Sequence, residues 1–435
     1  MLRMMLSDRR IFLGRAAALA GAFSASSFFQ QAHAADFHAA GVRIAGLDAL
    51  EAAQDEDYWA VIQRGYSVNP NLINLNNGGV SPSPIVVQQA VERYNQLSNE
   101  GPSYYMWRIL DQGREPLREK LATLAGTRAD EIAIDRNATE ALNTVIFGLD
   151  LKAGDEVIGS KQDYPHMIEA YRQRALREGV VYKQLSFDFP IEDEAVIVKA
   201  YEDAITPRTR LIHVTHMVNW VGQTMPVRKI ADMAHAHGIE VLCDGAHSFG
   251  LLDFKIPDLG CDYFGTSLHK FLSAPIGTGM MWIRQDKIEK VWPLVCNGEP
   301  RSGDIRKFED LGTRSFPLEQ GIGEALNFHN GIGPARKQAR IGYLKNYWAS
   351  RVQTMPSVRL HTSLNLKYSC AICGVSVDGM TPAELENALF DRYKIHTVGI
   401  VWENIRCVRV TPHVYTSIAD LDKLVRAMGE ISSRA

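Results

Sequence analysis

The chain has 435 residues, of which 46% are hydrophobic, and its 47 basic and 50 acidic side chains give a formal net charge of −3. This composition provides enough apolar side chains for a globular core and excludes a disordered or fibrous chain. No block of basic residues stands out, so no electrostatic signal for a nucleic-acid partner is present. The length favours two domains over one compact core.

The first 34 residues have the features of an export signal. Arg9 and Arg10 precede a Phe-Leu pair, a mildly apolar segment follows at 16–29, and an Ala-x-Ala cleavage pattern lies at 32–34. This order resembles a twin-arginine signal peptide. A permanent membrane span needs about 20 apolar residues, more than this segment supplies. We therefore expect export of the folded protein to the periplasm by the twin-arginine translocase; a basic start to a cytosolic protein is the alternative.

Short apolar runs alternate with amphipathic segments from about residue 116 to 290. The runs cover 131–135, 155–160, 209–216, 239–245, 262–267 and 279–284. Two of the amphipathic segments, 138–149 and 227–238, have helical spacing. This alternation is typical of a mostly parallel sheet with helices on both faces. Such sheets bind ligands beyond the carboxyl ends of their strands, where we expect the chemistry.

The C-terminal part has a different pattern, which predicts a smaller α+β domain. Its expected helices cover 334–355 and 381–393, and its expected strands cover 369–376 and 406–411. We expect residues 35–95 to form an N-terminal arm that contributes to this small domain. The large domain is then 96–325 and the small domain 326–435.

Neither a metal site nor a disulfide framework is expected. Cys370 and Cys373 form one CxxC motif without a second pair, which is weak evidence for zinc or a redox dithiol, and buried thiols are the commoner explanation. The histidines lack cysteine or carboxylate partners at ligand spacing. The sequence motifs typical of dinucleotide-binding, P-loop, zinc-peptidase and serine-hydrolase sites are absent.

Three predicted strand ends carry residues suited to catalysis or ligand binding. Asp244 ends one run, Lys270 follows another, and Asn137 stands where it can cap the helix after a third, with Glu140 placed to complete a capping box. A helix start at a strand-end crevice is an anion site. Pyridoxal phosphate (PLP) chemistry needs this set: a lysine for the aldehyde, a carboxylate for the pyridine nitrogen and a helix start for the phosphate. Each residue alone could be an ordinary turn or surface residue.

Longer motifs surround these positions. The most specific are DGAHSFG (244–250) and GTSLHKFLSAPIGTG (265–279), and NLNNGGVSPSP (74–84) and RVTPHVYTS (409–417) extend the likeness. Together they resemble the class V aminotransferase family of fold-type I PLP enzymes, in its isopenicillin N epimerase-like branch. The resemblance implies an α/β large domain with a mostly parallel seven-stranded sheet flanked by helices, a smaller α+β domain and a homodimer.

The resemblance also implies roles for individual residues. Lys270 matches the lysine that bonds to the cofactor aldehyde, Asp244 the partner of the pyridine nitrogen, and His247 the group that hydrogen-bonds the phenolic oxygen. The residues expected to contact the cofactor are Ala138, Thr139, Tyr164, Asn219, Asp244, His247, Ser267, His269, Lys270 and Thr313. Thr313 would act across the dimer interface.

The substrate side of the expected site is formed by three further residues. Arg409 matches the arginine that clamps a substrate carboxylate, although the nearby Arg406 is an alternative. Asn77 and Gly78 are expected at the mouth of the substrate site. Cysteine desulfurases need a nucleophilic cysteine on a loop well before this arginine, whereas Cys407 lies two residues before Arg409, so desulfuration is disfavoured.

The signal and the core motifs together resemble exported members of this branch that act on the glutamyl group of the peptide siderophore pyoverdine. We expect a periplasmic enzyme that acts at the α-amino carbon of a glutamyl or similar residue in a peptide metabolite, by oxidative decarboxylation or transamination. An aminotransferase or epimerase of free amino acids is one alternative. A catalytically silent binding protein with the same fold is the other.

Overall fold

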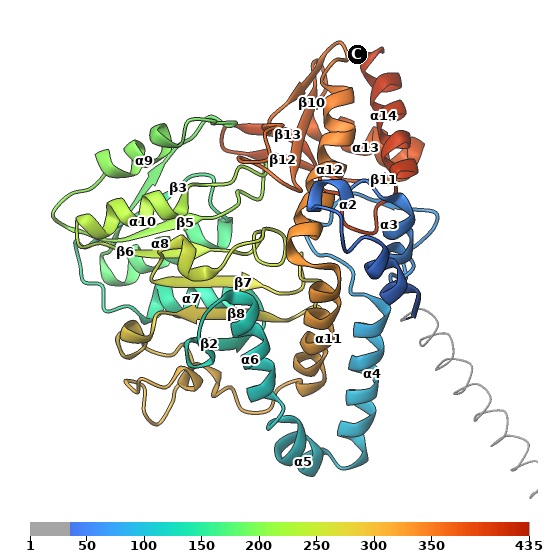
Figure 1. The fold of residues 1–435 in the computed structure, drawn as a ribbon. Helices are drawn as coiled ribbons and strands as arrows, with labels where there is room; N and C mark the ends of the chain where they lie inside the picture. The colour runs from blue at the N-terminus through green and yellow to red at the C-terminus, as the bar shows by residue number, and fades with distance from the viewer. Residues whose placement is uncertain (1–34, 435) are drawn as a thin grey trace, which may run out of the picture.

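The computed structural model describes residues 35–434, and its centre is a seven-stranded sheet with the order β2-β8-β7-β6-β5-β3-β4 (Figure 1). The strands are β2 (Ile132–Asp135), β3 (Glu156–Ser160), β4 (Val181–Leu185), β5 (Thr209–Thr215), β6 (Glu240–Asp244), β7 (Tyr263–Ser267) and β8 (Gly279–Ile283). Strand β8 is antiparallel to β2 and β7, and the other neighbours are parallel. The predicted fold class is confirmed.

Both faces of this sheet are covered, because apolar residues point alternately to opposite sides of each strand. In β2, for example, Ile132 and Ile134 belong to one apolar cluster and Ala133 to the other. Helices α7 (Ala138–Gly148) and α8 (Pro165–Glu178) pack on the side of Ala133. The opposite side is covered by α6 (Arg114–Ala125), α9 (Glu194–Asp203), α10 (Val227–Ala236) and α11 (Phe316–Ile332).

Six of the seven strands coincide with the apolar runs, and β4 does not. Its sequence is VYKQL, and none of its residues is fully buried. Strand β4 lies at the edge of the sheet and pairs only with β3. An edge strand faces solvent along one side, so it lacks the continuous apolar pattern of the inner strands.

The C-terminal region contains a four-stranded antiparallel sheet with the order β12-β13-β10-β9 (Figure 1). Its strands are β9 (Val358–Leu360), β10 (Cys373–Val377), β12 (Val398–Trp402) and β13 (Ile405–Val410). A separate apolar cluster joins them to α12 (Pro334–Val352), α13 (Pro382–Tyr393) and α14 (Ile418–Ser432).

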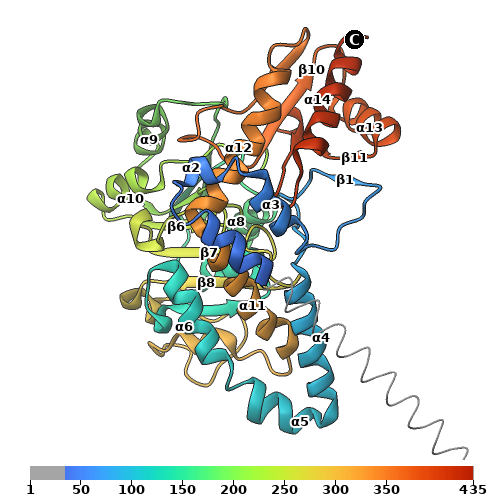
Figure 2. The same ribbon diagram turned by 45° about the vertical axis from the view of Figure 1, so that its right-hand side comes forward.

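The N-terminal arm runs along both parts of the molecule (Figure 2). Strand β1 (Ile73–Asn74) pairs in parallel with β11 (Ile395–His396) of the C-terminal region. Helix α2 (Ala49–Ala52) contacts α12, and α4 (Ile85–Glu100) packs along α11. Helix α3 (Glu56–Gln63) also belongs to the arm, and α5 (Pro102–Tyr104) and a six-residue π-helix at Tyr105–Leu110 follow at the start of the predicted large domain. The exact domain boundaries stay predictions.

The predicted export signal lies outside the described residues. Within residues 35–434, no helix combines the length and the apolar character that crossing a bilayer requires.

Candidate active site

A cavity of about 430 Å³ opens at the carboxyl ends of β5, β6 and β7. Most of the predicted site residues line it, although they come from segments far apart in the sequence. They are Gly78, Ala138, Thr139, Tyr164, Asn219, Asp244, His247, Ser267, His269, Lys270 and Arg409. The location agrees with the rule that α/β sheets bind ligands beyond the carboxyl ends of their strands.

Lys270, Asp244 and His247 meet at the floor of the cavity. Burial lowers the pKa of Lys270 to about 8, against the opposing effect of the Asp244 carboxylate. Burial also raises the pKa of Asp244, and it lowers the pKa of His247 well below its usual value. The Lys270 amine is therefore much closer to its reactive neutral form at neutral pH than an exposed lysine would be.

His247 bridges the lysine and the N-terminal arm. Its Nε2 atom lies 2.8 Å from the carbonyl oxygen of Gly78 and 3.2 Å from Nζ of Lys270. A carbonyl oxygen only accepts hydrogen bonds, so the neutral ring carries its proton on Nε2. In that tautomer the Nε2 proton is donated to the Gly78 carbonyl oxygen, and this bond holds the ring next to Nζ of Lys270.

The start of helix α7 forms the anion-binding side of the cavity. The Asn137 side chain accepts a hydrogen bond from the backbone N–H of Glu140, as predicted for an N-cap. The predicted capping box does not form, because the Glu140 carboxylate accepts instead from the backbone N–H of Arg136. Ser267 Oγ accepts from the N–H of Ala138 at 3.0 Å, which leaves the Ser267 hydroxyl proton for a ligand.

His269 lies beside this helix start. Its Nδ1 atom is 3.0 Å from the carbonyl oxygen of Thr278, so Nδ1 carries a proton and Nε2 remains for the cavity. Burial lowers the pKa of His269 in the protein alone. A bound anion would favour the protonated ring, in which Nε2 becomes a donor.

Arg409 and Asn219 form the opposite wall. Arg409 donates to the Asn219 carbonyl oxygen and to Oδ1 of Asn76, both at 2.9 Å, and its Nε atom has no partner among residues 35–434. Oδ1 of Asn219 is likewise buried and unpartnered in this part of the chain. Arg406 is exposed and three residues away on strand β13, so its side chain points to the other face. Of the two arginines, Arg409 lines the cavity and Arg406 does not, and the role of Arg409 as the carboxylate clamp stays a prediction.

An aromatic rim surrounds the opening of the cavity. Tyr164 directly precedes helix α8, is 38% exposed and stacks on His166 with ring centroids 5.1 Å apart. Trp220 also lines the cavity and stacks on Trp402 at 5.5 Å. The sequence motifs predicted Tyr164 but not Trp220.

Two predicted residues do not line the cavity. Asn77 is fully buried, its amide nitrogen donates to the Thr411 carbonyl oxygen at 2.9 Å, and its amide oxygen accepts from the hydroxyl of Tyr415. Asn77 therefore fastens the arm, and the neighbouring Asn76 accepts a hydrogen bond from Arg409 with its Oδ1 atom. Thr313 is exposed on the loop before α11, outside the cavity, and its contact across a dimer stays a prediction.

His213 lies behind Asp244 and was not predicted as part of the site. Its Nδ1 atom is 3.2 Å from the hydroxyl of Tyr171, and its buried Nε2 atom has no partner in the described chain. In the β5–β6 register, Thr215 stands opposite Asp244 and His213 opposite Leu242, so His213 shares the face of Asp244. Burial raises the Asp244 pKa, and His213 opposes this effect more than Lys270 does.

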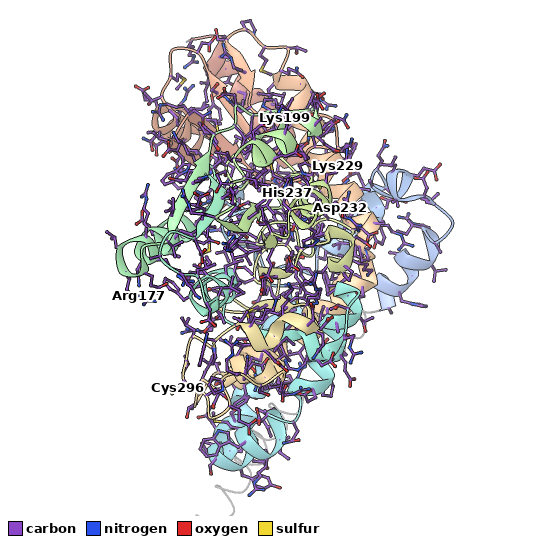
Figure 3. The ribbon with its side chains drawn as sticks, turned by 90° about the vertical axis from the view of Figure 1, so that its left-hand side faces the viewer. Arg177, Lys199, Lys229, Asp232, His237 and Cys296 are labelled. Carbon is purple, nitrogen blue, oxygen red and sulfur yellow. The ribbon has the colours of Figure 1, made fainter. Side chains whose placement is uncertain are left out.

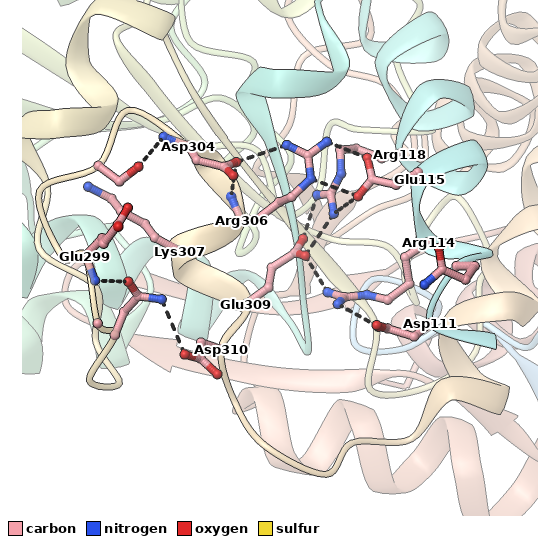
Figure 4. A pocket seen from close by; sticks show the side chains of 14 residues that line it. Asp111, Arg114, Glu115, Arg118, Glu299, Asp304, Arg306, Lys307, Glu309 and Asp310 are labelled. Carbon is pink, nitrogen blue, oxygen red and sulfur yellow. Dashed lines mark hydrogen bonds and ion pairs between the residues drawn. The ribbon is translucent and has the colours of Figure 1, made fainter. Parts of the chain in front are cut away.

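A second, larger hollow of about 610 Å³ lies beside α6, away from these residues (Figure 4). At its centre, Glu309 accepts from Arg118 at 2.6 and 2.8 Å and also pairs with Arg114. Glu309 further accepts from the N–H of Ile134, and Arg118 donates to the carbonyl oxygen of Ile132. Glu309 and Arg118 thus supply hydrogen-bond partners for the backbone of Ile134 and Ile132 at the outer edge of strand β2. Strand β2 leads directly into helix α7.

The residues of the first cavity fit PLP. The buried amide oxygen of Asn219 has no partner among residues 35–434, the carboxylate of Asp244 accepts from the N–H of Ala246, and both residues line the same space as Lys270. Gly279 allows the helix start to approach the sheet, since a Cβ atom there would lie 2.5 Å from the Asn137 backbone. The cavity thus offers an amine, a carboxylate and an anion-binding helix start on one surface.

The sequence matches the family model described as aminotransferase class-V over residues 73–424. Isopenicillin N epimerase of Amycolatopsis lactamdurans is 28% identical over 397 residues, which cover 86% of this chain and 98% of the epimerase. A probable cysteine desulfurase of Halalkalibacterium halodurans is 29% identical over 309 residues, 67% of this chain and 74% of that protein.

Solved structures share the fold. The cysteine desulfurase of Thermococcus onnurineus has a TM-score of 0.77 at 19% identity, with 86% of this chain and 98% of the desulfurase covered. The cystine C–S lyase C-DES, in complex with its product cysteine persulfide, has a TM-score of 0.75 at 22% identity, with 83% and 98% covered. With the family model spanning most of its length, the chain belongs to the class V aminotransferase family and is a PLP-dependent enzyme.

Proposed function

We propose that this protein is a periplasmic enzyme that acts at the α-amino carbon of a glutamyl or similar residue, held in a peptide metabolite such as a pyoverdine-type siderophore. The reaction is an oxidative decarboxylation or a transamination. The predicted signal at residues 1–34 and the likeness of the core motifs to the exported, siderophore-tailoring branch support this proposal.

The observation that carries the proposal is the state of Arg409. This side chain is 7% exposed, has no carboxylate partner in residues 35–434, and is held by two neutral oxygens in a fixed orientation. Burial lowers its pKa to about 10. A buried, unpaired guanidinium is costly, and a substrate carboxylate in bidentate contact offsets that cost. The cavity therefore selects substrates with a free carboxylate near the reacting carbon.

The chain supplies binding, orientation and proton transfer. When PLP is bound, it contributes an aldehyde that reacts with amines and a ring that withdraws electrons from the substrate α-carbon. Ser267, His269 and the α7 N-terminus would hold its phosphate, and Asp244 its ring nitrogen. Lys270 Nζ, with a pKa of about 8, can take up or give a proton near neutral pH.

Desulfuration, the activity in the names of several relatives, lacks a nucleophile in this cavity. No cysteine is among its lining residues. Cys407 is buried within β13, and burial raises the pKa of its thiol to about 12, so it is inert at neutral pH. Cys296 is exposed, but it lies near the end of the molecule opposite the C-terminal sheet (Figure 3). These positions favour chemistry at the α-carbon over sulfur transfer.

Two measurements test the proposal. Mass spectrometry of metabolites in a deletion strain should reveal a peptide that accumulates with its glutamyl α-amino group intact, and an unchanged metabolite profile would contradict the peptide substrate. Replacement of Arg9 and Arg10 by Lys should retain uncleaved precursor in the cytoplasm, whereas normal processing of that variant would contradict the export route.

The two other candidate functions give different results in the same assays. A free amino-acid aminotransferase or epimerase would turn over glutamate as well as its peptide form. A silent binding protein would bind the peptide without any change in the mass of the ligand.

A further inference from the structure

Lys270 stands in a turn, residues 268–278, that joins β7 to β8 and contains neither helix nor strand. Within it, the N–H of Ser273 donates to the carbonyl oxygen of Lys270 at 3.0 Å. The N–H of Ser81 in the arm donates to the carbonyl oxygen of His269 at 3.2 Å. Ser273 has a φ of 61°, in the left-handed region that a residue with a side chain keeps only when its surroundings enforce it. The turn therefore depends on contacts from neighbouring elements.

One such contact comes from Lys337 on helix α12. Its Nζ atom donates to the carbonyl oxygen of Phe271, the residue directly after Lys270. Nζ also lies 3.3 Å from Nδ1 of His329 on helix α11. Burial lowers the pKa of His329 well below its usual value, so the ring is neutral and its Nδ1 can accept a hydrogen bond. Lys337 thus ties the backbone next to Lys270 to two helices.

The burial of Lys337 has a cost that packing alone does not explain. Its side chain is 2% exposed, and its amine has no carboxylate partner among residues 35–434. Burial lowers the pKa of Lys337 to about 7. An apolar side chain of similar length would fill the same space without the desolvation of an amine. The amine is accounted for by its hydrogen bond to the Phe271 carbonyl oxygen.

A second contact reaches the same turn from the segment after β13. The ring of His413, four residues beyond Arg409, stacks on the ring of Phe271 with centroids 6.1 Å apart and planes 14° apart. Its Nε2 atom lies 3.3 Å from Oγ of Ser273. Burial, and after it the charge of Lys337, lower the pKa of His413 well below its usual value, so these groups form one buried cluster. The cluster holds the turn between α12 and the chain that follows Arg409.

We infer that Lys337 is a positioning residue for Lys270. By holding the Phe271 carbonyl oxygen, it fixes the turn so that Nζ of Lys270 stays beside His247 and faces the cavity. A covalent bond forms quickly only when the two reacting atoms are held at a suitable distance and angle. A loosened turn would therefore slow the reaction of Lys270 with the PLP aldehyde while the amine itself remains. This inference concerns the capture of PLP and does not depend on the identity of the substrate.

The test compares two buried lysines on one helix. Lys345 also lies on α12, is fully buried, and donates to the carbonyl oxygen of Ser363 at 2.8 Å and to Oγ of Ser369 at 2.6 Å. Lys337→Met and Lys345→Met thus remove the same group from the same element, and both should lower the melting temperature. Stopped-flow absorbance at fixed pH should show PLP capture by the apoprotein slowed at least about tenfold in Lys337→Met and within about twofold of wild type in Lys345→Met.

Two further measurements separate positioning from a general loosening of the fold. Pyridoxamine 5′-phosphate carries an amine in place of the aldehyde, so it cannot bond to Lys270 and its affinity reports the rest of the site. Calorimetry should give a dissociation constant within about twofold of wild type for both variants. Hydrogen exchange, followed by mass spectrometry of a peptide covering 268–278, should be at least about tenfold faster in Lys337→Met and unchanged in Lys345→Met.

If Lys337→Met does not fold, Lys337→Gln replaces it, because glutamine keeps a polar group on a shorter chain. Capture should then be slower, and exchange of the turn faster, by at least about threefold. Four results would overturn the inference: wild-type exchange of the turn; wild-type capture in a variant whose turn exchanges faster; an equal loss of capture in Lys345→Met; or a parallel loss of pyridoxamine phosphate affinity.

Discussion

Lys270 and Lys307 lie in different hollows of the molecule, and burial lowers the pKa of each to about 8. Lys307 borders the charged hollow beside α6 and donates to the carbonyl oxygens of Ile288 and Pro300 at 2.8 and 2.9 Å. Among residues 35–434, the Lys270 amine has only His247 within hydrogen-bonding distance, and it faces the active-site cavity. The same desolvation thus gives one lysine that is anchored and one that is available, so a low pKa alone does not mark a reactive group.

The two hollows also differ in how completely their other polar side chains are paired within the protein. In the charged hollow, Glu309 has two arginines and a backbone N–H as partners. In the active-site cavity, Arg409 and Asn219 each keep a buried atom without a partner in the described chain. The first arrangement stabilises the fold, and the second leaves hydrogen-bonding capacity for a ligand.

The largest effect is expected at the lysine itself. Lys270→Ala should shift the absorbance band of bound PLP to that of the free aldehyde and lower activity by about 10³-fold or more, because the nucleophile is lost. Lys307→Met should keep activity within about twofold, since the residue only fastens two carbonyls, at a cost of about 1–3 kcal/mol in stability. Absorption spectra and steady-state rates measure both. Wild-type spectra in Lys270→Ala, or a loss of the band in Lys307→Met, would contradict this assignment.

Removing a charge from the hollow beside α6 should lower the stability of the fold and leave the catalytic activity unchanged. Glu309→Gln leaves Arg118 buried without its carboxylate and should lower the free energy of unfolding by about 3–5 kcal/mol. Urea denaturation measures the change. Asp310→Asn, at an exposed neighbour, is the control and should stay within about 0.5 kcal/mol of wild type. Equal stability of the two variants would show that the Glu309 cluster does not support strand β2.

Two arginines on strand β13, Arg409 and Arg406, allow a test of which side chain binds the substrate carboxylate. Arg409→Met should raise KM for an amino-acid substrate by about 10- to 100-fold, the range for losing a hydrogen bond to a charged group. Arg406→Met removes an equal charge from the exposed face of β13 and should change KM less than about twofold. Initial-rate kinetics at fixed pH compare them, and a larger effect at Arg406 would reverse the assignment.

The smallest effect is a pH dependence of cofactor capture. Only the neutral amine of Lys270 reacts, so the rate of PLP uptake by the apoprotein should rise about tenfold per pH unit up to about pH 8 and then level off. The lowered pKa also means that the unfolded chain binds more protons between pH 8 and 10.5. This lysine therefore makes the apoprotein more stable as pH rises through that window. Stopped-flow absorbance measures uptake, and a rate that still rises at pH 10 would indicate an ordinary lysine.

Much of this arrangement is predictable from the sequence, for identifiable reasons. The inner strands of the large sheet are continuous apolar runs; Asp244 is the last residue of β6, and Lys270 lies three residues beyond the end of β7. Strand β4 was missed because an edge strand keeps polar residues such as Lys183 and Gln184.

Other features depend on contacts that no local pattern encodes. In the Asn76-Asn77 pair, tertiary contacts decide that Asn76 accepts from Arg409 while Asn77 donates to the Thr411 carbonyl oxygen. The Glu309–Arg118 pair joins segments 191 residues apart, and the approach of His213 to Asp244 follows from strand register. Periodicity reports the face of an element, whereas such contacts arise only in the assembled fold.

The most direct test of the account is to locate the covalent attachment of PLP. Borohydride reduction of the loaded protein, followed by peptide mapping, should place the pyridoxyl group on Lys270 and leave Lys307 unmodified. A modification on Lys307 or on another lysine, or no stable modification after reduction, would contradict the assignment of this cavity as the active site.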